Sequence, residues 1–168
     1  PTPGPDEYRV PCIQVNHLVP DSLADLCKET PMLEQPSKLD AIATAVIGAA
    51  LEVHRILGPG FLEGIYEEAL AIELELRGIN FQRQEMVAVS YKGREIGEGR
   101  TDFVIDGALI LEIKAVDKLT PVHQAQVLSY LKATGFHLGL LMNFHERLLR
   151  DGLKRIVLTG PPSTSPSS

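Results

Sequence analysis

The chain has 168 residues, of which 44% are hydrophobic and 23% are charged. This length suits a single domain that buries its own core without stabilisation by disulfides. The two cysteines are too few for a disulfide scaffold, and they lack the spacing of zinc ligands. The net charge of −6, from 16 basic and 22 acidic residues, argues against a protein that coats nucleic acid through a broad basic surface. It does not exclude an acidic pocket that holds a metal ion.

The sequence shows no sign of a membrane protein. No apolar run approaches the roughly 18 residues that a membrane-spanning helix needs, and no charged segment followed by an apolar one opens the chain. With so few cysteines, both are expected to stay reduced. We therefore expect an intracellular, cytoplasmic protein that does not contact membranes.

Composition divides the chain into three parts. Residues 1–37 carry seven of the 12 prolines, which predicts a largely irregular extension with one short helix near residues 21–27. Residues 160–168 consist only of Gly, Pro, Ser and Thr, which is typical of a disordered tail. The patterned domain is therefore expected to span residues 38–159.

Two amphipathic helices are predicted at the start of this domain. Apolar residues at steps of three and four indicate a helix over residues 41–57, with Asp40 as its N-cap. Gly58-Pro59-Gly60 ends that helix, because neither residue type continues a helix comfortably. A second helix is predicted over residues 61–77, with Gly78 as its left-handed stop.

The period then changes from helical to that of strands. Strands are predicted over residues 84–91 and 96–105, and Asp106-Gly107 is a strong hairpin signal. The nearly continuous apolar run at 108–116 fits a central strand that is buried on both faces. A third helix over 122–134 begins at Thr120-Pro121, and strands at 137–142 and 154–158 follow it. The expected fold is a mixed α/β sheet in the order α-α-β-β-β-α-β-β.

Three polar residues interrupt the predicted sheet. Glu112 and Lys114 are two positions apart and therefore share a strand face. A hairpin that closes at Asp106-Gly107 places Asp102 opposite about residue 111, within one position of Glu112. Burial of these groups costs several kcal/mol each unless a cation compensates. Carboxylate oxygens favour Mg²⁺ or Mn²⁺, but a salt bridge on a solvated face would explain the same residues.

The helices contribute further polar pairs. Glu63 and Glu67 lie at positions i and i+4 of the second helix, and this like-charged pair would benefit from a nearby cation. On the third helix, His123, Gln126 and Tyr130 form one polar stripe at spacings of three and four. Each group could equally be a solvated helix face.

Taken together, several motifs resemble a known family over residues 39–157. A G-x-x-E-x-x-Y signature runs from Gly60 to Tyr66, Glu112-Ile113-Lys114 forms an E-x-K triplet, and Gln126 precedes Tyr130 in a Q-x-x-x-Y element. In this order they resemble the GxxExxY protein family, a branch of the PD-(D/E)xK nuclease superfamily. The resemblance implies a restriction-endonuclease-like core of order α-β-β-β-α-β.

The resemblance also implies a role for each matching residue. Asp102 and Glu112 match the metal ligands, with the backbone carbonyl of Ile113 as a third ligand, and Lys114 matches the lysine that orients the attacking water. The remaining matches are Glu63, which would contact the metal through water or hold a second ion, and Gln126 and Tyr130, which would position the phosphate or brace the site. Thr101 stands where the superfamily often has Pro.

The expected function is therefore that of a Mg²⁺- or Mn²⁺-dependent nuclease whose substrate is nucleic acid, with DNA as the first expectation. The alternative is a catalytically silent module that uses the nuclease fold to bind a protein or nucleic-acid partner. The net charge favours the alternative modestly, whereas the complete D…E-x-K set favours the enzyme. The oligomeric state is left open, a homodimer included.

Overall fold

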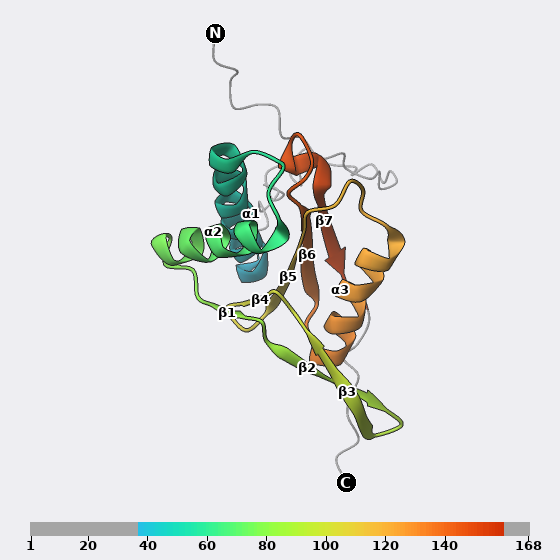
Figure 1. Cartoon of the computed structure of the whole chain (residues 1–168). Helices are drawn as coiled ribbons and strands as arrows, with labels where there is room; N and C mark the ends of the chain where they lie inside the picture. Colours follow the sequence, from blue (N-terminus) through green and yellow to red (C-terminus); the bar gives the residue numbers. More distant parts are fainter. Residues whose placement is uncertain (1–36, 160–168) are drawn as a thin grey trace, which may run out of the picture. The chain divides into compact units, whose positions relative to one another are not determined.

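A computed structural model describes residues 37–159 (Figure 1). The predicted extension, its short helix and the predicted tail lie outside these residues. The described part is a mixed α/β domain, which confirms the predicted fold class. None of its helices is long and apolar enough to cross a bilayer.

The centre of the domain is a five-stranded mixed sheet in the order β1-β4-β5-β6-β7. Only the central pair, β5 and β6, is parallel, and helix α3 (Pro121–Thr134) supplies the crossover between them. All other neighbours in the sheet are antiparallel. The strands are β1 (Phe81–Arg83), β4 (Phe103–Ile105), β5 (Leu109–Lys114), β6 (Leu138–Asn143) and β7 (Leu153–Val157).

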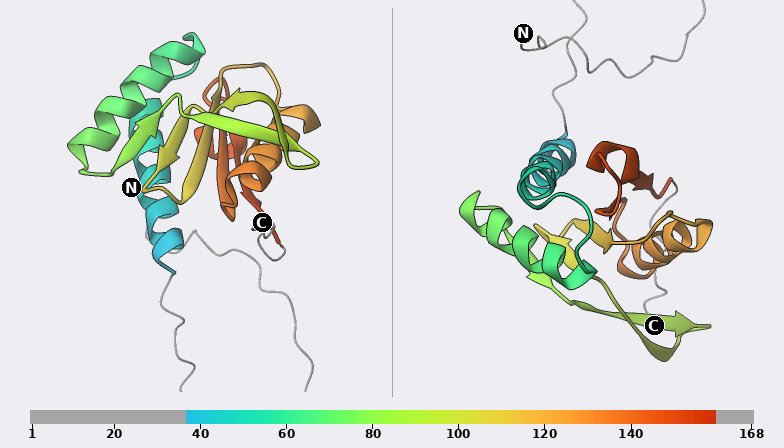
Figure 2. Two further views of the ribbon diagram at one scale, coloured as in Figure 1. Left: turned by 90° about the horizontal axis from the view of Figure 1, so that it is seen from below. Right: turned by 45° about the horizontal axis from the view of Figure 1, so that its top comes forward.

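Helices cover both faces of this sheet (Figure 2). Helices α1 (Lys38–Leu57) and α2 (Glu63–Leu76) pack with Leu109, Leu111 and Ile113 of β5 in the larger core. Ile110 instead packs on the α3 side with Val127. Because side chains of a strand alternate between faces, Glu112 and Lys114 share the face of Ile110.

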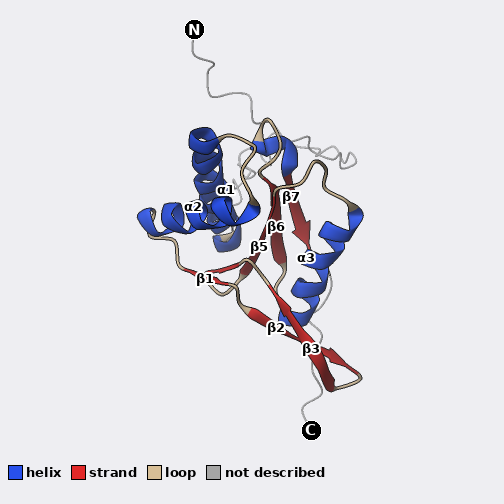
Figure 3. Ribbon diagram, in the orientation of Figure 1, coloured by secondary structure: helices blue, strands red, loops and turns tan. Residues whose placement is uncertain are grey.

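A separate two-stranded sheet projects beyond the main one (Figure 3). It consists of β2 (Met86–Tyr91) and β3 (Arg94–Arg100). The single strand predicted over residues 96–105 is therefore wrong in detail, because β3 and β4 belong to different sheets. The pairing continues across this division, where the Thr101 N–H donates to the Glu85 carbonyl and the Asp102 carbonyl accepts from the Gln84 N–H. Gln84 has a φ of 55°, which interrupts the strand at this point.

Several element ends differ from those predicted. Ser37 rather than Asp40 caps α1, since the Ser37 hydroxyl accepts a hydrogen bond from the Asp40 N–H. Strand β1 and the short 3-10 helix η1 (Leu149–Gly152) were not predicted. The ends of α3 agree with the sequence, with Thr120 as N-cap and Gly135 in the left-handed region.

Candidate active site

Asp102 and Glu112 meet across the β4–β5 hairpin. The observed register pairs Phe103 with Leu111, so Asp102 follows opposite Glu112 itself, one position beyond the predicted partner. The Ile113 N–H donates to Oδ2 of Asp102 over 2.7 Å, and the Asp102 N–H donates to Oε1 of Glu112 over 3.3 Å. Each carboxylate is thus held by the backbone of the opposite strand.

Lys114 places its ammonium group beside this pair. Nζ donates to the Ile113 carbonyl over 2.8 Å and to Oε2 of Glu112 over 3.4 Å. It also lies 3.8 Å from Oε1 of Glu63, at the start of α2. The ammonium therefore lies close to oxygen atoms of Glu112, Ile113 and Glu63, which are three of the four residues predicted to hold a metal.

Burial gives the two carboxyl groups unusual titration. Glu112 is only 1% exposed. Burial, followed by the neighbouring charge of Asp102, raises the pKa of Glu112 to about 7, although Lys114 opposes the rise. Burial also raises the pKa of Asp102, against the opposing hydrogen bond from the Ile113 N–H. Both carboxyl groups therefore resist ionisation, and a bound cation would stabilise their charged forms.

The structure separates the two glutamates of α2 that the sequence could not tell apart. Glu63 is the first residue of α2 and reaches toward Lys114. Glu67 instead accepts hydrogen bonds from Gln84 Nε2 over 2.7 Å and from Arg83 Nη2 over 3.2 Å. Glu67 therefore ties α2 to the link between β1 and β2, and Glu63 belongs with the carboxylate pair.

Gln126 and Tyr130 form a second polar group on α3. Gln126 Nε2 donates to the Tyr130 hydroxyl over 3.2 Å, and the Tyr130 ring lies against Gly99 of β3. Among the described residues, neither side chain hydrogen bonds to the carboxylate pair. His123 does not belong to this group, because its Nδ1 accepts from the Thr120 N–H in the capping box of α3.

Two supporting features were not predicted from the sequence. Asn143, at the end of β6, is fully buried, accepts from the Val116 N–H and donates to the Val116 carbonyl. These two bonds hold the chain that follows Lys114. Its sequence signal was an amide at the end of a buried apolar run. Gln84 and Arg83, which fix Glu67, carried no local signal because their partner lies on another element.

The donor set fits a hard divalent cation. It consists of carboxylate and carbonyl oxygens, the ligands that Mg²⁺ and Mn²⁺ prefer. In residues 37–159, no group of three or more His, Cys, Asp or Glu side chains surrounds a common point. A metal would therefore rely on Asp102, Glu112 and the Ile113 carbonyl together, and the Lys114 ammonium would have to move away from the oxygens it contacts.

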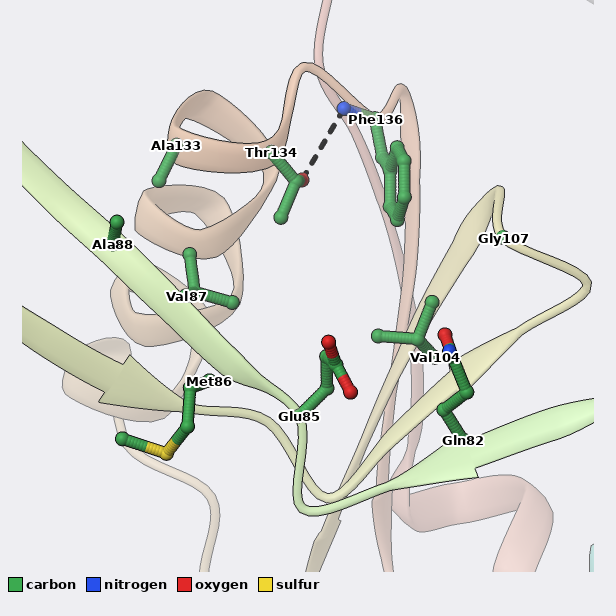
Figure 4. A pocket seen from close by; sticks show the side chains of 10 residues that line it. All are labelled: Gln82, Glu85, Met86, Val87, Ala88, Val104, Gly107, Ala133, Thr134 and Phe136. Carbon is green, nitrogen blue, oxygen red and sulfur yellow. Dashed lines mark hydrogen bonds between the residues drawn. The ribbon is translucent and has the colours of Figure 1, made fainter.

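A cavity of about 330 Å³ lies elsewhere, between the start of β2, strand β4 and the end of α3 (Figure 4). Its lining mixes apolar side chains such as Val87 and Phe136 with Gln82 and Glu85. None of the residues predicted from the motifs lines it. The carboxylate pair is therefore the better site for chemistry.

The chain was compared with protein families, curated proteins and solved structures. Residues 40–156 match the PD-(D/E)XK nuclease superfamily. No curated protein matches in sequence. Among solved structures, the chain is similar to the alkaline exonuclease LHK-Exo from Laribacter hongkongensis, with 15% identity, a TM-score of 0.41, and coverage of 75% of this chain and 72% of that one. The family match spans most of the described domain, and members of this superfamily generally use divalent metal ions. The chain therefore belongs to the PD-(D/E)XK nuclease superfamily.

Proposed function

We propose that this protein is a metal-dependent phosphodiesterase that cleaves nucleic acid, with DNA as its substrate and Mg²⁺ or Mn²⁺ as its cofactor. The observation that carries the proposal is the pairing of Asp102 with a buried Glu112, beside Lys114 on the same strand. Two carboxyl groups with raised pKa are costly in a sheet. A site that binds a cation gives them a function.

The residues have distinct roles in this proposal. Asp102, Glu112 and the Ile113 carbonyl would hold the metal, which when bound would polarise the phosphate and lower the pKa of a water. Lys114 would orient the attacking water and stabilise negative charge as the transition state forms. Glu63 would contact the metal through water or hold a second ion. Gln126 and Tyr130, both on α3, would support the side of the site next to this helix or position the phosphate.

We further propose that the chain belongs to the GxxExxY branch of the superfamily. The G-x-x-E-x-x-Y residues that support this assignment place Glu63 within 3.8 Å of Lys114. The signature and the E-x-K strand thus contribute to a single site.

A specific observation favours a second candidate, the silent binding module. The Lys114 ammonium already pairs with Glu112 and bonds to the Ile113 carbonyl, two of the groups that would otherwise hold a metal. In a silent module this internal ion pair would be the final state. In an enzyme the ammonium would move toward the phosphate when metal and substrate bind.

Cleavage assays decide between the two candidates. Single- and double-stranded DNA and RNA are incubated with Mg²⁺ or Mn²⁺, and binding to the same nucleic acids is measured in Ca²⁺. Metal-dependent cleavage by the wild type that is lost in Asp102→Ala supports the enzyme. Intact binding without cleavage of any substrate by any metal would contradict it and favour the module.

A further inference from the structure

Tyr66 joins the body of α2 to the segment that leads into it. Its side chain is fully buried, and its ring stacks on Phe144 with centroids 4.7 Å apart. The hydroxyl donates to the Gly58 carbonyl over 2.7 Å and accepts from the Phe61 N–H over 3.1 Å. One phenol thus fixes two points of the link between α1 and α2, residues 58–62.

Apart from the Gly58 N–H, which donates to the His54 carbonyl over 2.8 Å, the described structure gives this link few local restraints. Gly58 and Gly60 have φ values of 67° and 116°, a region that glycine adopts readily and that leaves the chain conformationally free. Leu62 is the N-cap of α2 and makes no side-chain capping bond. Leucine is among the poorest residues at this position. The first turn of α2 therefore lacks the usual local cap.

Glu63 is the residue that depends most on where this turn begins. It is the first residue of α2, its side chain is 43% exposed, and its carboxylate lies 3.8 Å from the Lys114 ammonium. Glu67, one turn later, is held by Arg83 and Gln84. Those bonds fix the position of α2 at Glu67, whereas the position of its first turn depends on the link.

We infer that Tyr66 is a positioning residue for the active site. Its hydroxyl bonds to the link at Gly58 and Phe61, fixes the direction in which the chain enters α2, and so holds the Glu63 carboxylate beside Lys114. The inference rests on the proposed role of Glu63 in metal binding. It gives the final residue of the G-x-x-E-x-x-Y signature a physical reason: the tyrosine holds the glutamate three residues before it.

If Tyr66 had only a structural role, the packing of its ring would account for it. The inferred positioning role depends instead on the hydrogen bonds of its hydroxyl. Tyr66→Phe separates the two, because it keeps the ring between Phe144 and Phe61. Only one side-chain partner is removed, from the Gly58 carbonyl and the Phe61 N–H, and the rest of the core is left intact. The variant is therefore expected to fold.

The test is a double-mutant cycle on the full chain, measured as Mn²⁺ affinity by titration calorimetry. Tyr66→Phe should weaken Mn²⁺ binding by about tenfold, the lower end of the effect expected when a supporting partner of a metal ligand is lost. Glu63→Gln should weaken it at least as much, and Tyr66→Phe should add nothing in that background. Tyr91→Phe is the matched control, because Tyr91 is 61% exposed on the projecting hairpin and should leave affinity unchanged.

Hydrogen exchange of residues 58–65 gives a second readout that needs no metal. Exchange there should become faster in Tyr66→Phe and stay unchanged in Tyr91→Phe. The inference would be overturned if the losses of Mn²⁺ affinity in Tyr66→Phe and Glu63→Gln multiplied in the double variant. It would also be overturned if Tyr66→Phe lowered the melting temperature but kept the Mn²⁺ affinity of the wild type. If the wild type neither binds Mn²⁺ nor cleaves, the proposed function fails separately. Unchanged exchange in residues 58–65 would then overturn the positioning role as well.

Discussion

Tyr130 of α3 lies directly against Gly99 of β3, so closely that a Cβ at position 99 would overlap the Tyr130 ring. This contact joins the projecting hairpin to the helix that carries Gln126. Gly99 has no positive φ, so its backbone would accept alanine and only the ring stands in the way. The absence of a side chain at position 99 therefore allows the hairpin and α3 to approach.

Gly99→Ala should destabilise the domain by about 1–3 kcal/mol, the usual cost of overpacking. It should also reduce cleavage, because the Tyr130 ring must shift. The measurement of stability is chemical denaturation. Gly64→Ala is the control, since a Cβ there meets nothing within 4 Å and φ is not positive, and alanine in this helix should leave stability unchanged or raise it. In a Tyr130→Ala background, Gly99→Ala should cost much less. An equal cost in both backgrounds would place the strain elsewhere.

Metal binding should depend on Asp102. If Asp102 and Glu112 share an ion, Mg²⁺ or Mn²⁺ raises the melting temperature by mass action, and Asp102→Ala removes that rise. Thermal melts at increasing metal concentration measure the effect. Asp151→Ala is a control, because Asp151 is exposed on η1, outside the proposed site. Equal shifts in wild type and Asp102→Ala would locate the ion at other residues.

Lys114 should matter for cleavage far more than for binding. Lys114→Ala keeps the metal ligands, so nucleic-acid affinity in Ca²⁺ should stay within about tenfold, which is about 1.4 kcal/mol. Cleavage should fall about a hundredfold or more, as when a transition-state donor is lost. Lys118→Ala, an exposed lysine four residues later, serves as the control. Unchanged cleavage in Lys114→Ala would remove this lysine from the mechanism.

Stability without metal should fall as the pH rises from about 4.5 to about 7. The folded-state pKa of Glu112, about 7, exceeds its ordinary value of 4.5, so the folded protein binds more protons than the unfolded chain across this window. Each pKa unit corresponds to about 1.4 kcal/mol, and the raised pKa of Asp102 acts in the same direction. Above pH 7 the loss should level off.

Denaturation of wild type and Glu112→Gln at a series of pH values measures this effect. The glutamine variant carries no titrating group at this position and should show a flatter profile. Mn²⁺ affinity should rise over the same pH window, since the ligands must lose their protons. A wild type that grows more stable with pH relative to Glu112→Gln would contradict the prediction.

Residues 37–159 should fold without the flanking segments, because they contain the periodic apolar faces of the chain. A fragment limited to these residues should unfold in one cooperative transition with the same midpoint as the full chain. Calorimetry of the two proteins side by side measures this. Loss of the cooperative transition would show that a flanking segment contributes to the core.

The sequence predicted best those features that local interactions determine. Asp106 and Gly107 adopt φ values of 48° and 63°, as a tight hairpin turn requires. Because that turn sets the register of β4 against β5, the approach of Asp102 to Glu112 could be calculated to within one position. Thr120 and Gly135 marked the ends of α3 for the same reason, since a cap acts on its own helix.

The features that escaped prediction depend on distant partners. The division between β3 and β4 depends on the opposite segment, because it lies across from Gln84, whose φ of 55° interrupts the strand and which no local pattern shows. Glu63 and Glu67 share one helix face, and only the position of Arg83 and Gln84 shows which of them is free for the site. The Tyr66 hydroxyl bonds to Gly58 and Phe61 in the preceding link, partners that the spacing of the signature does not show.

The connection of β5 to its two neighbours has a consequence for folding. The β4–β5 hairpin closes a short local loop, an event of about 1–10 μs for a hairpin, whereas β5 meets β6 only after the whole of α3 has crossed over. We therefore expect Asp102 and Glu112 to meet while still in water and to be buried later. Proton uptake by these two groups should then accompany the docking of α3 and β6, so the last step of folding should be slower in alkaline than in mildly acidic solution.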